Sequence, residues 1–236
     1  MQRYFSNIKE NDLYLLSNND NYHITKVMRM NKGDKIEIID NEIVYICKIE
    51  NVNPVKARVI EKLDENNENE KKIIIIQSLV NENKMDFILQ KCCELGMYKF
   101  YGYKAYNSII KDNGKNDKKI IRWQRIVKEA SEQSKRNIIP EVVGIININE
   151  LCNLKADLKI LLSVNEMSTT IKKVLQDSNC CDTIIIVVGP EGGFTKEEED
   201  ILIKNNFIRT SLGKRVLRSE TASITALSMI DYEWMV

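Results

Sequence analysis

Two loops in the C-terminal half of the chain have the composition of a ligand-binding site. In the first, the apolar run Ile184–Val188 leads directly into Gly189–Gly193, a turn with almost no side-chain bulk. Thr195 and Glu198 have the spacing of a capping box, which predicts a helix beginning at Lys196. A buried strand, a small-residue loop and a helix N-terminus together expose backbone N–H groups to a ligand. The alternative interpretation is a purely structural glycine turn.

The second loop, Ser211–Ser223, contains Ser219 as the predicted N-cap of a helix that runs from Glu220 towards Trp234. Neither loop carries the motif of a common catalytic class. Gly213 precedes a lysine but lacks the upstream glycine of a P-loop, and the patterns Gly-x-Gly-x-x-Gly and Gly-x-Ser-x-Gly are absent. The sequence therefore argues against P-loop ATPases, Rossmann dinucleotide enzymes and serine hydrolases.

Alternating strands and helices position the two loops. Continuous apolar strands that alternate with helices favour a parallel sheet covered on both faces. The predicted strands are Ile73–Leu79, Phe100–Tyr103, Leu158–Val164 and Thr183–Val188, and the main predicted helices are Asn83–Leu95 and Lys118–Arg136.

The N-terminal part of the chain is predicted to be a separate β domain. Lys35–Asp40, Ile43–Ile49 and Val55–Leu63 are short, rich in β-branched residues and separated by turn signals. The polar stretch Leu63–Lys72 shows no periodicity and is typical of a linker. We therefore expect a small barrel-like domain over residues 1–68 and an α/β domain over residues 72–236.

Composition narrows the class of protein. The 236 residues are 43% apolar and carry a net charge of +1, so a sizeable core is expected without a global basic field. No stretch is long enough to span a bilayer, and the N-terminus lacks an apolar signal region. The six cysteines show no Cys-x-x-Cys spacing, and the single His23 has no ligand-like neighbour. We expect reduced thiols in a cytoplasmic protein without a metal site.

Charged and polar residues recur at helical spacing and on the N-terminal domain, where they are either nucleic-acid contacts or solvated surface groups. The N-terminal set is Arg3, His23, Lys26 and Arg29, the long-helix set is Arg122, Arg125, Glu129, Gln133 and Arg136, and the short-helix set is Lys84, Lys91 and Glu94.

Several motifs, in order along the chain, resemble those of the RsmE family. VVGPEGGFTKEE followed by LGKRVLRSETA closely resembles the last two motifs of this family, which belongs to the SPOUT superfamily of RNA methyltransferases. KMDFILQKCCELGM and RWQRIVKEASEQSKRNIIP are similar to its two helix motifs, and HITKVMRMNKGD is similar to its N-terminal signature. Only the stretch Leu151–Cys181 matches loosely.

The resemblance implies a fold and an activity. The α/β half would be a SPOUT-type parallel sheet whose C-terminal segment forms a trefoil knot, one of the rare exceptions to unknotted topology. It would be preceded by a PUA-like β-barrel. The protein would act as a homodimer and methylate N3 of a uridine in 16S ribosomal RNA of the small subunit. Its methyl donor would be S-adenosylmethionine, with no metal and no membrane partner.

The resemblance also implies site residues. Arg218 is the candidate cation that stabilises the developing uracil anion, and the alternative is a salt bridge with Glu220. No general base can be named, and Glu94 is interpreted as a partner of Arg136. The expected RNA contacts are Arg3, Arg29, Lys84, Lys91, Glu94, Gln133 and Arg136, whereas Arg122 and Arg125 favour a solvated helix face. The expected cofactor-binding residues are Leu162, Val188, Gly189, Pro190, Glu191, Gly192, Gly193, Leu212, Gly213, Val216 and Leu217.

Two rival functions remain open at this stage. One is an RNA-binding module in which the C-terminal loops hold no cofactor. The other is a different SPOUT enzyme, which acts on transfer RNA or on a ribose hydroxyl.

Overall fold

A computed structural model describes residues 1–108, 116–178 and 181–234. Within them the chain forms two units. The first consists of residues 1–68 together with 131–139, and the second of residues 69–130 together with 140–236. The short segment 131–139, which we expected in the second domain, thus groups with the first.

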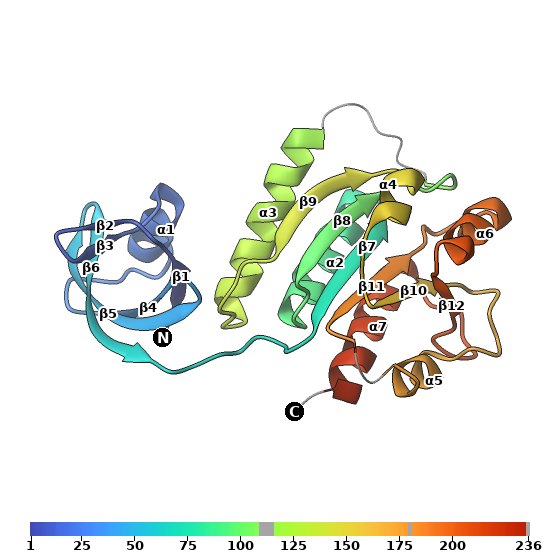
Figure 1. Ribbon diagram of the computed structural model, residues 1–236. Helices are drawn as coiled ribbons and strands as arrows, with labels where there is room; N and C mark the ends of the chain where they lie inside the picture. Colours follow the sequence, from blue (N-terminus) through green and yellow to red (C-terminus); the bar gives the residue numbers. More distant parts are fainter. Residues whose placement is uncertain (109–115, 179–180, 235–236) are drawn as a thin grey trace. The chain divides into compact units, whose positions relative to one another are not determined.

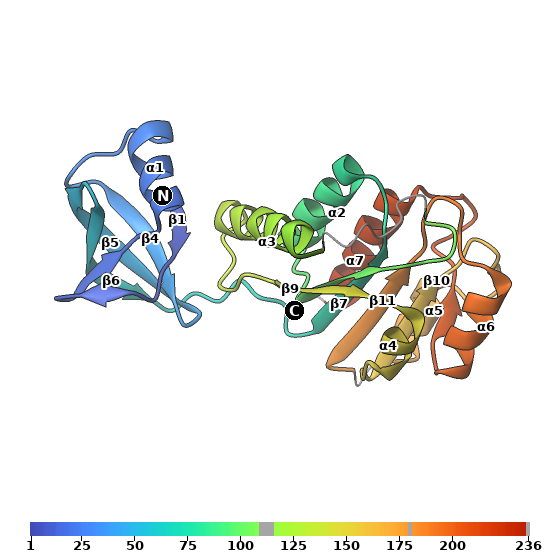
Figure 2. The ribbon, with the colours of Figure 1, turned by 90° about the horizontal axis from the view of Figure 1, so that it is seen from above.

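The first unit is built on a six-stranded mixed sheet that curves into a half-barrel (Figure 2). The sheet order is β1-β4-β5-β6-β3-β2, in which only the β1–β4 pair is parallel. The predicted strands are confirmed, and β5 extends three residues further, to Val52. The strands are β1 Arg3–Phe5, β2 Lys9–Glu10, β3 Leu13–Leu15, β4 Lys35–Asp40, β5 Ile43–Val52 and β6 Val55–Leu63.

A helical segment that the sequence reading missed crosses this unit. It consists of α1, Asn18–Tyr22, followed directly by one turn of π-helix, η1, His23–Val27. Ser17 caps α1 by accepting a hydrogen bond from the backbone N–H of Asp20. The buried core beneath the sheet comprises Tyr4, Tyr14, Leu16, Ile24, Ile36, Ile38, Cys47, Ile49, Val55 and Ala57.

The second unit has the predicted parallel sheet, with strand order β12-β10-β11-β7-β8-β9, in which each neighbouring pair of these strands is parallel. The strands β9 and β12 were not predicted: Gly144 interrupts the apolar residues of β9, and β12 has only 3 residues. The strands are β7 Lys72–Ser78, β8 Lys99–Tyr103, β9 Glu141–Ile146, β10 Leu158–Leu162, β11 Thr183–Val188 and β12 Ile208–Thr210.

Helices cover both faces of this sheet, as Figures 1 and 2 show. α2 and α7 pack together on one face, while α4 and α6 lie on the other. Alternate residues of the central strand β11 therefore contact opposite layers, and Ile185 and Val187 pack with Leu202 of α6. The helices are α2 Glu82–Glu94, α3 Asn116–Gln133, α4 Ile148–Asn153, α5 Ile171–Gln176, α6 Lys196–Lys204 and α7 Ser219–Trp234.

The long helix α3 ends three residues before its predicted end. Gln133 is its last residue, and Lys135 adopts a left-handed φ of 63°. A helix cannot continue through that conformation, so Arg136 leaves the face it was predicted to share with Arg122 and Arg125.

Candidate functional site

A cavity of about 500 Å³ opens where β10, β11 and β12 end. The carboxyl edge of a parallel sheet is where open α/β folds bind ligands. Both glycine loops contribute to its walls, so the structure brings together two loops that α6 and β12 separate in the sequence. The cavity is lined by every residue predicted to bind a cofactor and by Arg218: Leu162, Val188, Gly189, Pro190, Glu191, Gly192, Gly193, Leu212, Gly213, Val216, Leu217 and Arg218.

The first loop is a tight turn held from outside. The N–H of Gly193, which has a φ of 68°, donates to Pro190 O at 3.0 Å. Asn107 Nδ2 donates to the carbonyl oxygens of Gly192 and Gly193 at 3.3 and 3.1 Å. The carbonyl oxygens of Pro190, Gly192 and Gly193 thus all accept hydrogen bonds from within the protein.

The helix that follows the first loop begins as predicted. Thr195 and Glu198 form a reciprocal capping box, and α6 begins at Lys196. The Glu198 carboxylate also accepts the hydroxyl of Tyr103 at 2.9 Å, which ties this helix start to the end of β8.

The second loop is anchored at its beginning. The backbone N–H of Ser211 donates to Thr169 O at 2.8 Å, and Ser211 O accepts the N–H of Ile171 at 3.0 Å. Gly213 then takes a φ of 124°, a conformation that favours glycine. Ser219, predicted as an N-cap, is instead the first residue of α7, and its hydroxyl donates to Gly189 O at 2.6 Å.

A charged cluster lies beside the first loop. Lys84 Nζ is 2.9 Å from a Glu191 carboxylate oxygen and 3.7 Å from one of Glu220. Burial alone would raise the pKa of the Glu191 carboxyl, but its hydrogen bond with Lys84 and a backbone N–H lower that pKa below its ordinary value. Glu220 therefore pairs with Lys84, and the alternative Arg218–Glu220 salt bridge is not observed. The exposed Arg218 side chain has no ion-pair partner among the described residues.

Sequence reasoning missed one polar wall of the cavity. Ser163 Oγ donates to a Glu199 carboxylate oxygen at 2.7 Å, and Arg209 lies 3.4 Å from the other Glu199 oxygen. Both Ser163 and Glu199 line the cavity and are buried. Their signal was weak, because a serine at a strand end and a glutamate among helical charges are common surface features.

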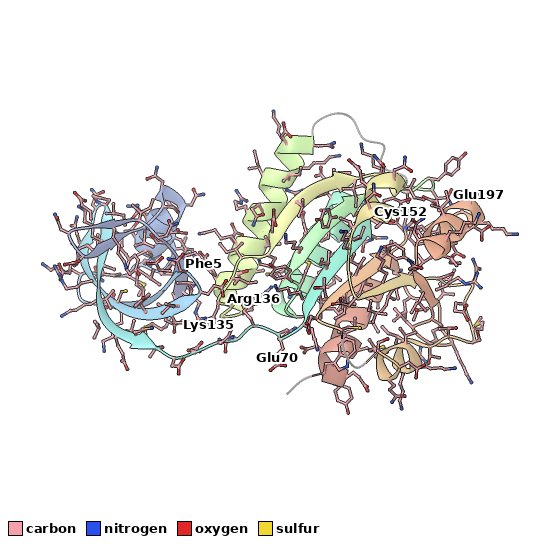
Figure 3. All side chains as sticks on the ribbon, in the orientation of Figure 1. Phe5, Glu70, Lys135, Arg136, Cys152 and Glu197 are labelled. Atoms are coloured by element: carbon pink, nitrogen blue, oxygen red, sulfur yellow. The ribbon has the colours of Figure 1, made fainter. Side chains whose placement is uncertain are left out.

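Arg3 does not lie on the surface, which corrects its expected role in an RNA-facing patch. Its side chain is 1% exposed and pairs with Glu37 at 2.8 Å and Glu65 at 2.7 Å. Its Nη1 also donates to the carbonyl oxygens of Lys135 and Arg136, at 2.5 and 3.3 Å. The guanidinium thus closes the first unit around the segment 131–139, where Figure 3 labels Lys135 and Arg136.

Arg136 likewise differs from expectation. It is 3% exposed and forms an ion pair with Glu68, which places its charge inside the first unit. A phosphate contact requires an accessible cation, whereas the guanidinium of Arg136 is buried and paired. Arg29 and Gln133 are exposed, as a substrate contact requires.

The remaining predicted contacts lie on α2. Lys91 pairs with Glu94 at 2.8 Å, one turn along the same helix. Lys84 belongs to the charged cluster beside the cavity. On α3, Arg122 pairs with Asp86, and Arg125 pairs with Glu129 at 3.3 Å, in agreement with a solvated helix face.

In residues 1–108, 116–178 and 181–234, no helix is long and apolar enough to cross a membrane. Within the same ranges, histidine, cysteine and carboxylate side chains form no cluster of three that could hold a metal ion.

Comparison with known proteins gives consistent matches. Residues 67–231 match the family model of an RNA methyltransferase domain, and residues 19–62 match that of an RNA methyltransferase PUA domain. The chain is 34% identical to Ribosomal RNA small subunit methyltransferase E of Bacillus subtilis, over 99% of this chain and 97% of that relative. It is 32% identical to the protein of the same name in Mesomycoplasma hyopneumoniae, over 97% and 98% of the two chains.

A solved structure agrees. Ribosomal RNA small subunit methyltransferase E from Neisseria gonorrhoeae, bound to S-adenosyl methionine, has a TM-score of 0.89 with this chain at 29% identity, covering 99% of this chain and 98% of that one. Because both family models match in order, and the similarity runs over nearly the whole of each relative, this chain belongs to the RsmE family of ribosomal RNA small subunit methyltransferases.

Proposed function

We propose that this protein transfers a methyl group from S-adenosylmethionine to N3 of a uridine in 16S ribosomal RNA, acting in the cytoplasm. One observation carries the proposal: a single cavity gathers both glycine loops and the cation Arg218 at the carboxyl edge of the sheet. Its volume of about 500 Å³ lies in the range of cofactor sites, roughly 300–1,000 Å³. The solved structure of the Neisseria relative is bound to S-adenosyl methionine.

The residues present fit the proposed cofactor. The cavity is lined by three exposed apolar side chains, Val164, Met167 and Val216, which are 55%, 75% and 80% exposed. This apolar surface suits a ligand that is itself partly apolar. A Cβ added at Gly193 or Gly213 would meet no atom within 4 Å, which leaves the backbone of both loops accessible. Backbone groups of this kind recognise a ligand without bulky side chains.

In the proposed reaction, the protein mainly positions two reactants, the methyl donor and the uracil ring. The bound cofactor would supply a sulfonium methyl group, whose bond to sulfur breaks as a bond to the uracil nitrogen forms. Neutral uracil carries a proton on N3 and is a poor nucleophile, so negative charge develops on the ring as that proton leaves to solvent. Arg218 is free to stabilise this charge, because it lines the cavity and has no ion-pair partner among the residues described.

Mass mapping of ribosomal RNA tests the proposed activity. RNA from cells lacking this protein should lose one methyl group on a uracil of the small subunit, and purified protein with S-adenosylmethionine should restore it. A methyl group restored on a ribose, or on transfer RNA, would contradict the proposed substrate.

Cofactor binding provides a direct prediction for the second loop. Gly213→Val places a β-branched side chain at a φ of 124°, so the loop must rearrange. We expect calorimetry to show S-adenosylmethionine affinity reduced by at least about tenfold, a change of about 1.4 kcal/mol. Gly33→Val is the matched control, because Gly33 has a φ of 101° but lies in the first unit. Equal losses in both variants would contradict the loop assignment.

Gly192 of the first loop has closer neighbours than Gly193 and Gly213. A Cβ at Gly192 would lie 3.1 Å from Cβ of Asn107. Gly192→Val would therefore displace Asn107 from the loop carbonyls, rather than place bulk directly against the ligand.

We further propose a homodimer and a knotted C-terminal segment. α7 returns from β12 to pack on α2, β7 and β11, and the loop before it hydrogen-bonds to residues 169–171, an arrangement that supports threading of the C-terminal segment.

Met229 and Tyr232 of α7 are 37% and 78% exposed, which supports a partner subunit on that face. Light scattering at micromolar protein should report twice the chain mass of 27.4 kDa, and Met229→Glu should shift the mass towards one chain. A wild-type mass of one chain would contradict the dimer.

A further inference from the structure

The central strand β7 carries a polar residue where its sequence is otherwise apolar. Gln77 interrupts the run that begins with Ile73, and its side chain is 0% exposed. A buried amide destabilises a protein unless its hydrogen bonds are made inside the fold. The partners of Gln77 therefore indicate why an amide stands at this position.

Those partners form a directional relay that ends at the cavity. Ser223 Oγ donates to Gln77 Oε1, and the same hydroxyl lies 3.2 Å from Ser219 O. Gln77 Nε2 donates to Ser219 Oγ at 2.8 Å and to Ser78 O at 3.1 Å. Ser219 Oγ, with its acceptor side occupied, donates its one proton to Gly189 O at 2.6 Å.

The relay connects three elements that must be in register for the proposed reaction. Gln77 is the penultimate residue of β7, Ser219 begins α7, and Gly189 opens the first loop. Ser219 and Gly189 both line the cavity, and Arg218 is the residue immediately before Ser219. Directional hydrogen bonds fix the first loop and the start of α7 relative to each other, which apolar contacts would not do.

We propose that Gln77 is a positioning residue for methyl transfer, acting through Ser219 to hold the first loop and Arg218 in one arrangement. The inference rests on the proposed function. A misplacement of about 1 Å at a reacting centre can lower a rate about 10²-fold. An apolar residue of similar size would fill the same space without directing Ser219.

The test compares Gln77→Leu, Ser219→Ala and their double variant. In single-turnover methylation at saturating RNA and cofactor, we expect each single variant to be slower by up to about 10²-fold. The double variant should be no slower than the slower single variant, because both break one relay. Ser219→Thr keeps the hydroxyl and should stay within about threefold of wild type, which a loss of packing alone would not predict.

Ser78→Ala is the matched control. Ser78 neighbours Gln77 on the same strand and is also fully buried, but its hydroxyl has no hydrogen-bond partner among the described residues. Its rate should equal that of wild type, and thermal unfolding of every variant is measured alongside. Folded Gln77→Leu with the wild-type rate, or rate losses that multiply in the double variant, would overturn the inference. If Gln77→Leu does not fold, Ser223→Ala, which removes one donor, decides in its place.

Cofactor affinity separates this inference from the proposed substrate. Calorimetry with S-adenosylmethionine alone should show about tenfold weaker binding for Gln77→Leu, because the Ser219 hydroxyl that donates to Gly189 O is then no longer oriented by the amide. If wild type binds the cofactor but methylates no 16S RNA, the substrate proposal fails, and unchanged cofactor affinity in Gln77→Leu then overturns the positioning role.

Discussion

Arg218→Ala is expected to lower the single-turnover rate of methyl transfer by about 10²- to 10³-fold, the usual effect of removing one group that stabilises developing charge. The loss should fall on the rate at saturating substrates, because the charge of uracil develops only as the reaction proceeds. RNA affinity should stay within about threefold, because Arg218 lines the cavity and is not among the expected phosphate contacts. Arg218→Lys keeps a charge without the planar fork and should fall between wild type and alanine.

Arg125→Ala is a suitable control for the Arg218 variant. Arg125 is equally long and exposed but pairs with Glu129 on α3 rather than lining the cavity. Salt-titrated RNA binding and single-turnover methylation are measured for both. If Arg218→Ala lost RNA affinity but kept its rate at saturating RNA, the residue would be an RNA contact and not a catalytic one.

Arg3→Ala is expected to destabilise the first unit by about 3 kcal/mol, the lower end of the effect of removing one partner from a buried ion pair. The lower end applies because Glu65 is 36% exposed and water can solvate it. The variant leaves Glu37 and two carbonyl oxygens of the segment 131–139 without their shared donor. Hydrogen exchange of amides in β1 and β4 should accelerate about 10²-fold.

Tryptophan fluorescence cannot replace hydrogen exchange as the measurement for Arg3→Ala. Trp123 and Trp234 both belong to the second unit, so their fluorescence does not report the first. Arg29→Gln is the contrasting variant, because Arg29 is exposed and should weaken RNA binding and reduce the salt slope by about one unit without changing exchange. Wild-type exchange in Arg3→Ala, accompanied by the same loss of RNA affinity, would restore Arg3 as a contact residue.

Features set by neighbouring residues were predictable from the sequence. The capping box Thr195–Glu198, the helix start at Lys196 and the strand Thr183–Val188 depend on spacings of a few residues, and all three were confirmed. The two loops could be predicted to bind a ligand because glycine permits tight turns and leaves backbone groups accessible, which the sequence alone shows. Their meeting in one cavity followed only from the resemblance, since no local pattern fixes how parallel strands are ordered.

Features set by distant partners were not predictable. An arginine at position 3 is usually solvated, and the carbonyl of Lys135 that accepts its hydrogen bond lies 132 positions away. Ser219 had the local signature of an N-cap, but Gln77, 142 positions earlier, and Gly189 engage its hydroxyl. Long-range partners of this kind determine whether a polar residue is solvated, supports the fold or belongs to the functional site.

The composition of the first unit has a consequence for the order in which the protein folds. Residues 131–139 belong to this unit, and Asn137 alone hydrogen-bonds to Asn67, Glu68, Glu42 and Glu65. On the translating ribosome, the N-terminal sheet is therefore released before the segment that completes it has been made. At about 5–20 residues per second, that wait lasts on the order of 4–14 s, during which Arg3 has no carbonyl partners from the segment. Until residues 131–139 have been synthesised, the nascent first unit therefore lacks the hydrogen bonds that this segment contributes to it.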